Sequence, residues 1–103
     1  MFAQTPEPPY YAVIFTSLKA KEDQGYSAMS NHMVALVQQQ EGFLGFESAR
    51  ETLGITVSYW RDEASILAWK AQIEHQQAQK AGKERWYTDY KIRIAKVERD
   101  YAK

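Results

Sequence analysis

The chain has 103 residues, of which 45% are hydrophobic and 25% are charged, and its thirteen basic and thirteen acidic side chains cancel. This length suits one domain around one core, and the lack of cysteine excludes disulfides, thiolate metal sites and cysteine nucleophiles. Without a basic excess or a long apolar run, we expect a protein that binds neither nucleic acid nor a membrane. The lack of cysteine and of a visible targeting segment makes the cytoplasm the expected location.

The charges are divided unevenly along the chain. Residues 1–79 hold five basic and nine acidic side chains, whereas residues 80–103 hold eight and four. This polarity could serve self-association or attract an anionic ligand. A solvated C-terminal strand and loop is the simpler explanation.

The chain opens with a proline-rich leader over residues 1–9, and the domain begins at Tyr10. The segment Tyr10–Ser17 is rich in aromatic and β-branched residues, so we predict a strand that is buried on both faces. After a charged connection, apolar residues recur three or four apart from Tyr26 to Gln40, which is typical of a helix. Gly42 suits the end of that helix.

Two strands follow in the middle of the chain. Phe43–Glu51 carries apolar side chains on both faces, and Ile55–Trp60 is the clearest strand pattern in the sequence. Residues 52–54 join them as a short turn. We therefore predict a hairpin.

A second helix and a last strand complete the pattern. Asp62 is a good N-cap, and apolar residues at helical spacing continue toward Gln79. The segment Thr88–Val97 predicts the fourth strand. Its apolar residues alternate at Tyr90, Ile92 and Ile94 and then shift by one position to Ala95 and Val97. We therefore expect a bulge near Ala95.

The element order β-α-β-β-α-β predicts an α+β, ferredoxin-like fold, with one antiparallel sheet and both helices on one face. Two helices can cover only one face of the sheet, yet the strand Tyr10–Ser17 is apolar on both. An exposed apolar sheet face usually marks an interface. We therefore expect a homodimer in which a second copy covers that face.

The segment Tyr59–Trp69 resembles the strand-into-helix signature of the antibiotic biosynthesis monooxygenase (ABM) family, in which two tryptophans stand nine residues apart around a charged cap. The segments Gly42–Ser48 and Trp86–Val97 are similar to an uncharacterised bacterial branch of that family, so the resemblance spans residues 10–101. It implies a dimeric α/β barrel of two ferredoxin-like protomers, each with a ligand cavity between helices and sheet. Characterised relatives include cofactor-independent oxygenases of polyketide quinone precursors, haem-degrading monooxygenases and quinol monooxygenases.

The resemblance to the haem-degrading members does not extend to their haem-binding residues. Those enzymes use an Asn in the first strand and a His ten residues after the second Trp of the signature. Here Trp69 matches that Trp, but Gln79 stands at the His position and Tyr10–Ser17 contains no Asn. Glutamine is not an ordinary ligand of haem iron. We therefore expect no haem degradation, no metal site and no bound cofactor.

Two residues are candidates for the chemistry itself. Trp69 could form a wall that stacks a planar ligand, although aromatics at helical spacing are more often core residues. His75 could act as a general base, because imidazole exchanges protons near neutral pH, and a solvated helix histidine is the alternative. Trp86 and Tyr90 could close the cavity or anchor a dimer interface. The candidate substrate pocket consists of Trp60, Gln79, Trp86 and Tyr90.

The resemblance implies a cofactor-independent monooxygenase that acts on a small aromatic or quinol-like compound with O2. Such a reaction needs a substrate that loses a proton and then reacts with oxygen as a carbanion or phenolate. No dinucleotide fingerprint or phosphate loop is present to support a nicotinamide or flavin cofactor. The alternative is a non-catalytic small-ligand-binding or stress-related dimer of the same fold.

Overall fold

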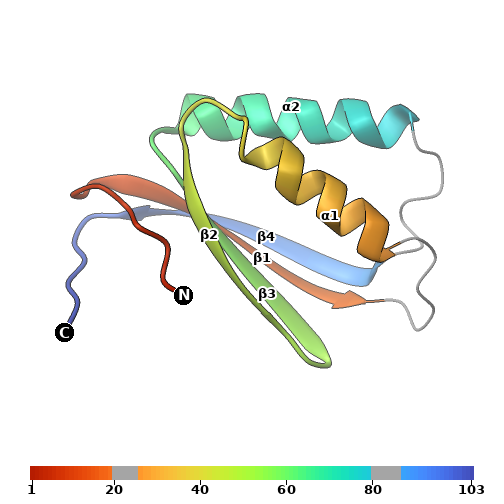
Figure 1. The fold of residues 1–103 in the computed structure, drawn as a ribbon, viewed down its shortest axis with the longest axis horizontal. Coiled ribbons are helices and arrows are strands. Elements are labelled where there is room, and N and C mark those ends of the chain that lie inside the picture. Colours follow the sequence, from red (N-terminus) through yellow and green to blue (C-terminus); the bar gives the residue numbers. More distant parts are fainter. Residues whose placement is uncertain (20–25, 80–86) are drawn as a thin grey trace.

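The computed structural model describes residues 1–19, 26–79 and 87–103, without the side chains of residues 26–27, 75–79 and 87–88. In this part of the chain six elements follow in the predicted β-α-β-β-α-β order (Figure 1). They are β1 (Tyr10–Lys19), α1 (Tyr26–Val37), β2 (Phe43–Arg50), β3 (Leu53–Trp60), α2 (Glu63–Gln79) and β4 (Tyr87–Val97). No helix in the described ranges has the length and apolar character that a membrane span requires.

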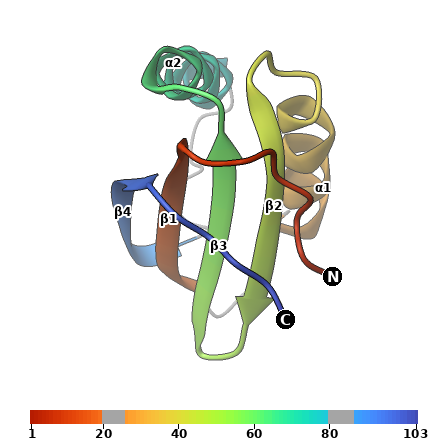
Figure 2. The same cartoon turned by 90° about the vertical axis from the view of Figure 1, so that its left-hand side faces the viewer.

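The strands form one antiparallel sheet in the order β2-β3-β1-β4. Both helices lie over one face of it, and no described helix lies over the other (Figures 1 and 2). This arrangement confirms the predicted ferredoxin-like α+β fold. Successive side chains of a strand point to opposite faces. We call the helix-covered face, which includes Val13 and Trp60, the inner face, and the other, which includes Ile14 and Tyr59, the outer face.

The bulge predicted near Ala95 is wrong, because β4 pairs with β1 without interruption there. The register shifts instead where β4 begins, opposite the last residues of β1. The change of parity in the sequence has another origin. Ile92 and Ile94 lie on the inner face, whereas Ala95 and Val97 lie on the outer face. The strand is therefore apolar toward the inner face in its middle and toward the outer face near its C-terminal end.

Five element boundaries also differ from the sequence pattern, and two of them, the end of β2 at Arg50 and the start of β4 at Tyr87, differ by one residue. Pairing between Leu18 and Leu53 extends β1 and β3 beyond their predicted ends. Helix α1 ends at Val37 rather than Gln40, where the backbone hydrogen bonds become those of tighter turns. Long-range pairing lengthens the strands, and the local turn shortens the helix.

The core is centred on Trp60, whose side chain has no exposed surface. Val37 of α1 and Ile66 of α2 are the other buried members of this cluster. The indole ring meets Phe43 edge-on, with ring centroids 5.3 Å apart, and stacks against Trp69 at 6.1 Å. One side chain of β3 therefore holds both helices against the sheet.

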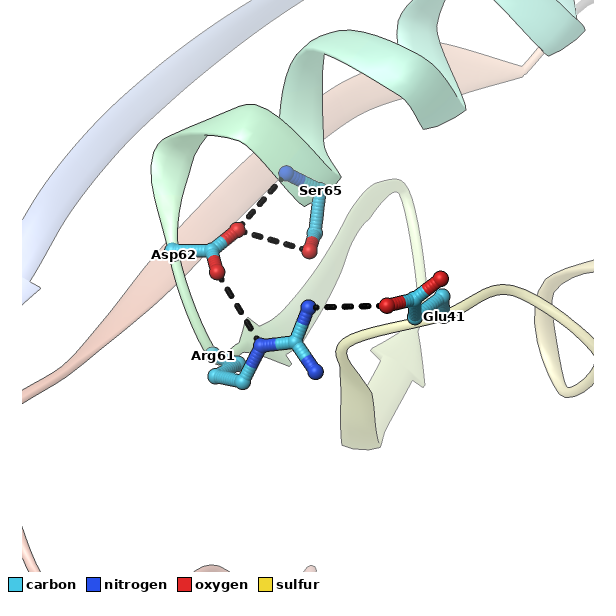
Figure 3. Close-up of polar contacts among 4 residues, drawn as sticks. All are labelled: Glu41, Arg61, Asp62 and Ser65. Carbon is cyan, nitrogen blue, oxygen red and sulfur yellow. Dashed lines mark hydrogen bonds and ion pairs between the residues drawn. The ribbon is translucent and has the colours of Figure 1, made fainter.

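The β3–α2 junction is fastened to the start of β2 (Figure 3). The Arg61 amide donates a hydrogen bond of 2.7 Å to the carbonyl of Gly42, and its guanidinium contacts Asp62 at 3.0 Å and Glu41 at 3.4 Å. Asp62 is confirmed as the N-cap, because its Oδ1 accepts bonds from the Ser65 amide at 2.8 Å and the Ser65 hydroxyl at 2.7 Å. Gly42 has φ +83°, and a Cβ there would lie 2.1 Å from Ser65 Oγ, so this turn requires glycine.

The leader crosses the outer face at the end where β1 begins (Figure 2). The Ala3 amide donates to Glu47 Oε2 at 2.9 Å, and the Tyr59 hydroxyl donates to Glu47 Oε1 at 2.7 Å. Burial and the bond to Glu47 raise the pKa of Tyr59 to about 12, while the hydroxyl of Tyr59 and the amide of Ala3 lower the pKa of Glu47. A neutral phenol and a charged carboxylate therefore hold the leader through neutral pH.

The C-terminal tail leaves β4 at the same end of the sheet and passes in front of the outer face (Figure 2). The Tyr10 hydroxyl donates to Asp100 and accepts a bond of 3.1 Å from Thr5 Oγ1. The bond to Asp100 is the main reason why the pKa of Tyr10 is raised. Tyr10 and Ala12 are both buried here. Leader and tail thus cover one end of a face that no described helix covers.

We expect the stability of the protein to fall in acid, partly through Asp62. Bonds from the Ser65 hydroxyl, the Ser65 amide and Arg61 lower the pKa of Asp62 from 3.8 to about 2. The unfolded chain is therefore protonated first, and the stabilisation is complete above the unfolded pKa and is lost as the pH falls through the folded pKa. Asp62→Asn retains a capping oxygen but does not titrate.

Urea midpoints measured from mildly acidic pH down to the folded pKa of Asp62 test this. The midpoint of Asp62→Asn should fall less steeply than that of the wild type. An unchanged steepness would contradict the assigned role of the carboxylate.

Candidate functional site

Strand pairing arranges the side chains of the inner face in rows across the sheet. From the junction end they are Phe43–Trp60–Tyr11–Lys96, Phe46–Ser58–Val13–Ile94, Ser48–Thr56–Phe15–Ile92 and Arg50–Gly54–Ser17–Tyr90. The first row is largely aromatic and packs under the helices. Apart from Phe46, the later rows are polar or glycine on β2 and β3, and they are mostly apolar on β1 and β4.

The two tryptophans of the predicted site meet at the aromatic end. The rings of Trp60 and Trp69 are 6.1 Å apart and inclined by 29°. Trp60 is fully buried and also donates from its indole Nε1 to Ser58 Oγ at 2.9 Å. Trp69 is only partly buried. Of the two, Trp69 is the ring with surface left to offer a ligand.

Hydroxyl groups line the part of the inner face formed by β2 and β3. Ser48 Oγ and Thr56 Oγ1 lie 3.0 Å apart across the two strands. A hydroxyl both donates and accepts, so each member of such a pair keeps capacity for a further hydrogen bond. This pair can therefore orient an oxygen atom of a ligand.

Arg50 places a positive charge at the far end of these rows. Its guanidinium crosses Gly54 and donates to both the hydroxyl and the carbonyl of Ser17, the latter at 3.5 Å. A Cβ on Gly54 would lie 2.1 Å from Arg50 Cζ, so glycine leaves the space for this crossing. Ser17 is 2% exposed, which holds the contact inside the fold.

An apolar strip lies on β4, which β1 separates from β3 and β2. Tyr90, Ile92 and Ile94 point to the inner face but are 58%, 52% and 53% exposed. The Tyr90 ring lies 5.7 Å from that of Phe15, tilted by 37°. The structure thus leaves an apolar strip uncovered on the side of the sheet where the helices lie, next to hydroxyls and a guanidinium.

The predicted site residues are distributed over both ends of the inner face. Trp60 and Trp69 come together at the aromatic end, and Tyr90 lies at the opposite end. His75 and Gln79 belong to α2, with side chains outside the described residues, and Trp86 also lies outside them.

The hydroxyl pair and the Arg50–Ser17 contact were not anticipated from the sequence. Alternation along β2 places Ser48 and Arg50 on one face, which was a usable signal. Ser17 is 33 residues from Arg50, however, and only the strand register brings the two together. Among the described residues, no group of three or more His, Asp or Glu side chains is arranged to hold a metal ion.

Comparisons with known proteins agree on one family. The sequence profile described as antibiotic biosynthesis monooxygenase matches residues 9–81. The uncharacterised protein YqjZ of Bacillus subtilis is 50% identical over 99 residues, which cover 94% of this chain and 87% of that protein.

Solved structures share the fold. PA3566 from Pseudomonas aeruginosa has a TM-score of 0.69 and 19% identity, over 93% of this chain and 99% of that one. An MhuD mutant with two manganese protoporphyrin IX molecules bound per active site has a TM-score of 0.64 and 20% identity, over 89% of this chain and 99% of that one.

Truncation of the two tryptophans should affect stability unequally. We expect Trp60→Ala to lower the free energy of unfolding by about 3–5 kcal/mol, because it empties the centre of the core. Trp69→Ala should cost distinctly less, since part of its ring already faces water and fewer contacts are lost. Urea melts measure both, with Tyr101→Ala, at a residue that is 97% exposed, as a control that should resemble the wild type. A larger loss for Trp69→Ala would contradict the assignment of the core.

Proposed function

Because the chain belongs to the antibiotic biosynthesis monooxygenase family, we propose that it is a cofactor-independent monooxygenase that acts on a small aromatic or quinol-like compound with O2. The observation that carries this proposal is the exposed strip of Tyr90, Ile92 and Ile94 on the inner face, with Phe15 of β1 between this strip and the hydroxyls of Ser48 and Thr56. Apolar surface with a few convergent polar groups is what a small aromatic ligand requires.

The surrounding residues suit the stages of such a reaction. The ring of the substrate would lie against Phe15 and Ile92, with an oxygen atom at the hydroxyl pair. When the substrate loses a proton, negative charge develops on it. The guanidinium of Arg50, in the next row, would stabilise the developing anion more than it stabilises the neutral substrate. An electrostatic contact that acts in this way lowers the barrier to proton removal.

No cofactor is needed when the substrate supplies both electrons. In a substrate with a CH2 group between aromatic rings, for example, that group would lose a proton, and the carbanion would form a carbon–oxygen bond with O2. Cleavage of the O–O bond then leaves a carbonyl group and releases water. The carbon is oxidised, one oxygen atom enters the product and the other is reduced to water.

We propose His75 as the base that removes the first proton. The described strands of the inner face hold no carboxylate and no imidazole, so a base for this site would come from a helix or from outside the described residues. His75 belongs to α2, which lies over this face (Figure 1). Gln79, on the same helix, and Trp86 are proposed as further pocket residues, together with Trp60 and Trp69.

The same observations support a second candidate, a non-catalytic small-ligand-binding or stress-related protein. The described inner-face strands supply hydrogen bonds, a positive charge and apolar surface, all of which bind a ligand without reacting with it. The two candidates differ only in whether a base is positioned at the bound ligand.

We further propose that the protein works as a homodimer in the cytoplasm. Leu18, Leu53 and Ile55 are exposed on the outer face, where apolar side chains of this size favour burial against another surface. The inner face would then remain available to the ligand in both copies.

Oxygen uptake with a panel of hydroquinones and related aromatic compounds tests the proposed activity. We expect the wild type to consume oxygen with at least one compound, and His75→Ala to lose about a hundredfold or more in rate, as removal of a general base does. His32→Ala is the matched control, since this histidine is exposed on α1, and it should leave the rate unchanged. Saturable binding without oxygen uptake would favour the second candidate, and neither binding nor uptake would contradict both.

Haem should not be degraded. We expect this because Gln79 stands at the position where the haem-degrading relatives carry a His, and because β1 contains no Asn. Haem titration should give no sharp, stoichiometric Soret shift, and addition of a reductant should open no ring. Stoichiometric binding followed by ring opening would contradict the transfer of those residues.

A further inference from the structure

The guanidinium of Arg50 lies flat across a glycine of the neighbouring strand. The three atoms nearest to a Cβ built on Gly54 are Cζ, Nη2 and Nε of Arg50, and Cζ is the nearest of the three. In the plane of a guanidinium the nitrogens surround Cζ, so a point beside its edge would lie closer to a nitrogen than to Cζ. The Cβ position therefore lies under one face of the guanidinium, and that face is turned toward Gly54.

The edge of the same guanidinium is held by β1. Its Nη2 donates to the Ser17 hydroxyl, and its Nη1 donates to the Ser17 carbonyl at 3.5 Å. Ser17 is 2% exposed, and Gly54 is also buried. With one face against β3 and one edge at β1, the plane of the guanidinium follows the sheet. Its second face is turned away from the sheet, toward the side on which the helices lie (Figure 2).

We propose that Arg50 is a stacking platform: a planar, electron-rich ring of the ligand lies face to face on the guanidinium, on the side opposite to Gly54. A planar, delocalised cation stacks on aromatic rings and is attracted by their π electrons. Arg50 is half-buried, so part of its surface remains exposed. This inference rests on the proposed function and assigns Arg50 as a residue that determines which ligands the site prefers.

Gly54 supports a role beyond holding the strands together. Arg50 could simply brace the end of β2 against β1, but the backbone already fixes this register, because Gly54 pairs with Arg50 on one side and with Ser17 on the other. Glycine weakens the interior of a strand, and it often marks a place where a ligand or another chain segment approaches the backbone closely. Here it gives up a side chain on an inner strand of the sheet to make room for a flat guanidinium.

The stacking position adjoins the position already proposed for the ligand. Phe15 and Ile92, against which the ring would lie, are in the neighbouring row, and rows on one face are about 7 Å apart. Two fused or joined rings could contact both this row and Arg50. When the ligand loses a proton, electron density on its rings rises, and their attraction to the guanidinium rises with it.

A ring compound and its saturated counterpart test the stacking by isothermal titration calorimetry. 2-Naphthol and decahydro-2-naphthol share a carbon skeleton and a hydroxyl group, but only the first is planar and has π electrons. Arg50→Gln should raise the dissociation constant of 2-naphthol about fivefold or more and that of decahydro-2-naphthol by less than about twofold. Lys96→Gln removes the same charge from the same face, at the opposite end of the sheet, and should change neither. Equal changes in both dissociation constants on Arg50→Gln would overturn the stacking.

Two further variants separate the plane of the guanidinium from its charge. Arg50→Lys keeps the charge but not the planar group, so most of the loss in 2-naphthol affinity should remain. Gly54→Ala keeps Arg50 and Ser17, but its Cβ takes the space under the guanidinium and should displace it. The φ of Gly54 is not positive, so its backbone accepts alanine. We expect Gly54→Ala to weaken 2-naphthol binding about as much as Arg50→Gln does, and an unchanged affinity would overturn the flat placement.

These measurements do not depend on oxygenation. A wild type that binds 2-naphthol through Arg50 without oxygen uptake would support the platform and favour the non-catalytic function. Oxygen uptake by a protein whose 2-naphthol affinity is independent of Arg50 would leave the activity and overturn the platform. A wild type that does not bind 2-naphthol would overturn it as well. If Arg50→Gln lowers the urea midpoint and leaves both affinities unchanged, Arg50 is only a brace and the inference is wrong.

Discussion

The structure depends on the burial of one indole ring at the centre of the sheet. Trp60 is fully buried; its ring contacts Phe43, the first residue of β2, and Trp69 of α2, and it shares a core cluster with Val37 of α1 and Ile66 of α2. A two-layer domain of this length has a single small core, and few other large side chains in the described residues are buried as deeply. Contacts that would be spread over several residues in a larger domain are concentrated here. Both helices keep their place over the sheet through this one ring.

The position of Trp60 also explains where a ligand surface is left. The ring lies in the first inner-face row, next to the junction that Asp62 and Gly42 fix, so helices and sheet are held together at that end. Rows farther along the strands lack a comparable aromatic anchor on β3. There the inner face keeps Ile92 and Tyr90 exposed, next to hydroxyls and a guanidinium. Tight packing at one end and exposure at the other follow from the same distribution of large side chains.

Much of the fold could be predicted because its signals are local. Helical spacing, the Asp62 cap and the hairpin pattern each involve residues within one element or turn, and the structure confirms them. The bulge at Ala95 was wrong because a change of parity has two explanations, an extra residue or a strand that is apolar on both faces. Only pairing with β1 distinguishes them. For the candidate site, the resemblance to the family signature identified Trp60 and Trp69 but could not show that the first is buried completely and the second only in part.

The sequence by itself determined the order of the elements, the ends that capping residues mark and the family. These properties are encoded by periods of two and 3.6 residues and by motifs whose members are neighbours in the chain. Only the tertiary structure decided which apolar side chains lie in the core and which stay in water. It also brought Arg50 to Ser17, 33 residues away, and aligned Glu47 with Arg93 across the outer face. Exposure and row alignment depend on how distant strands register and on what packs over them, and no local pattern carries that information.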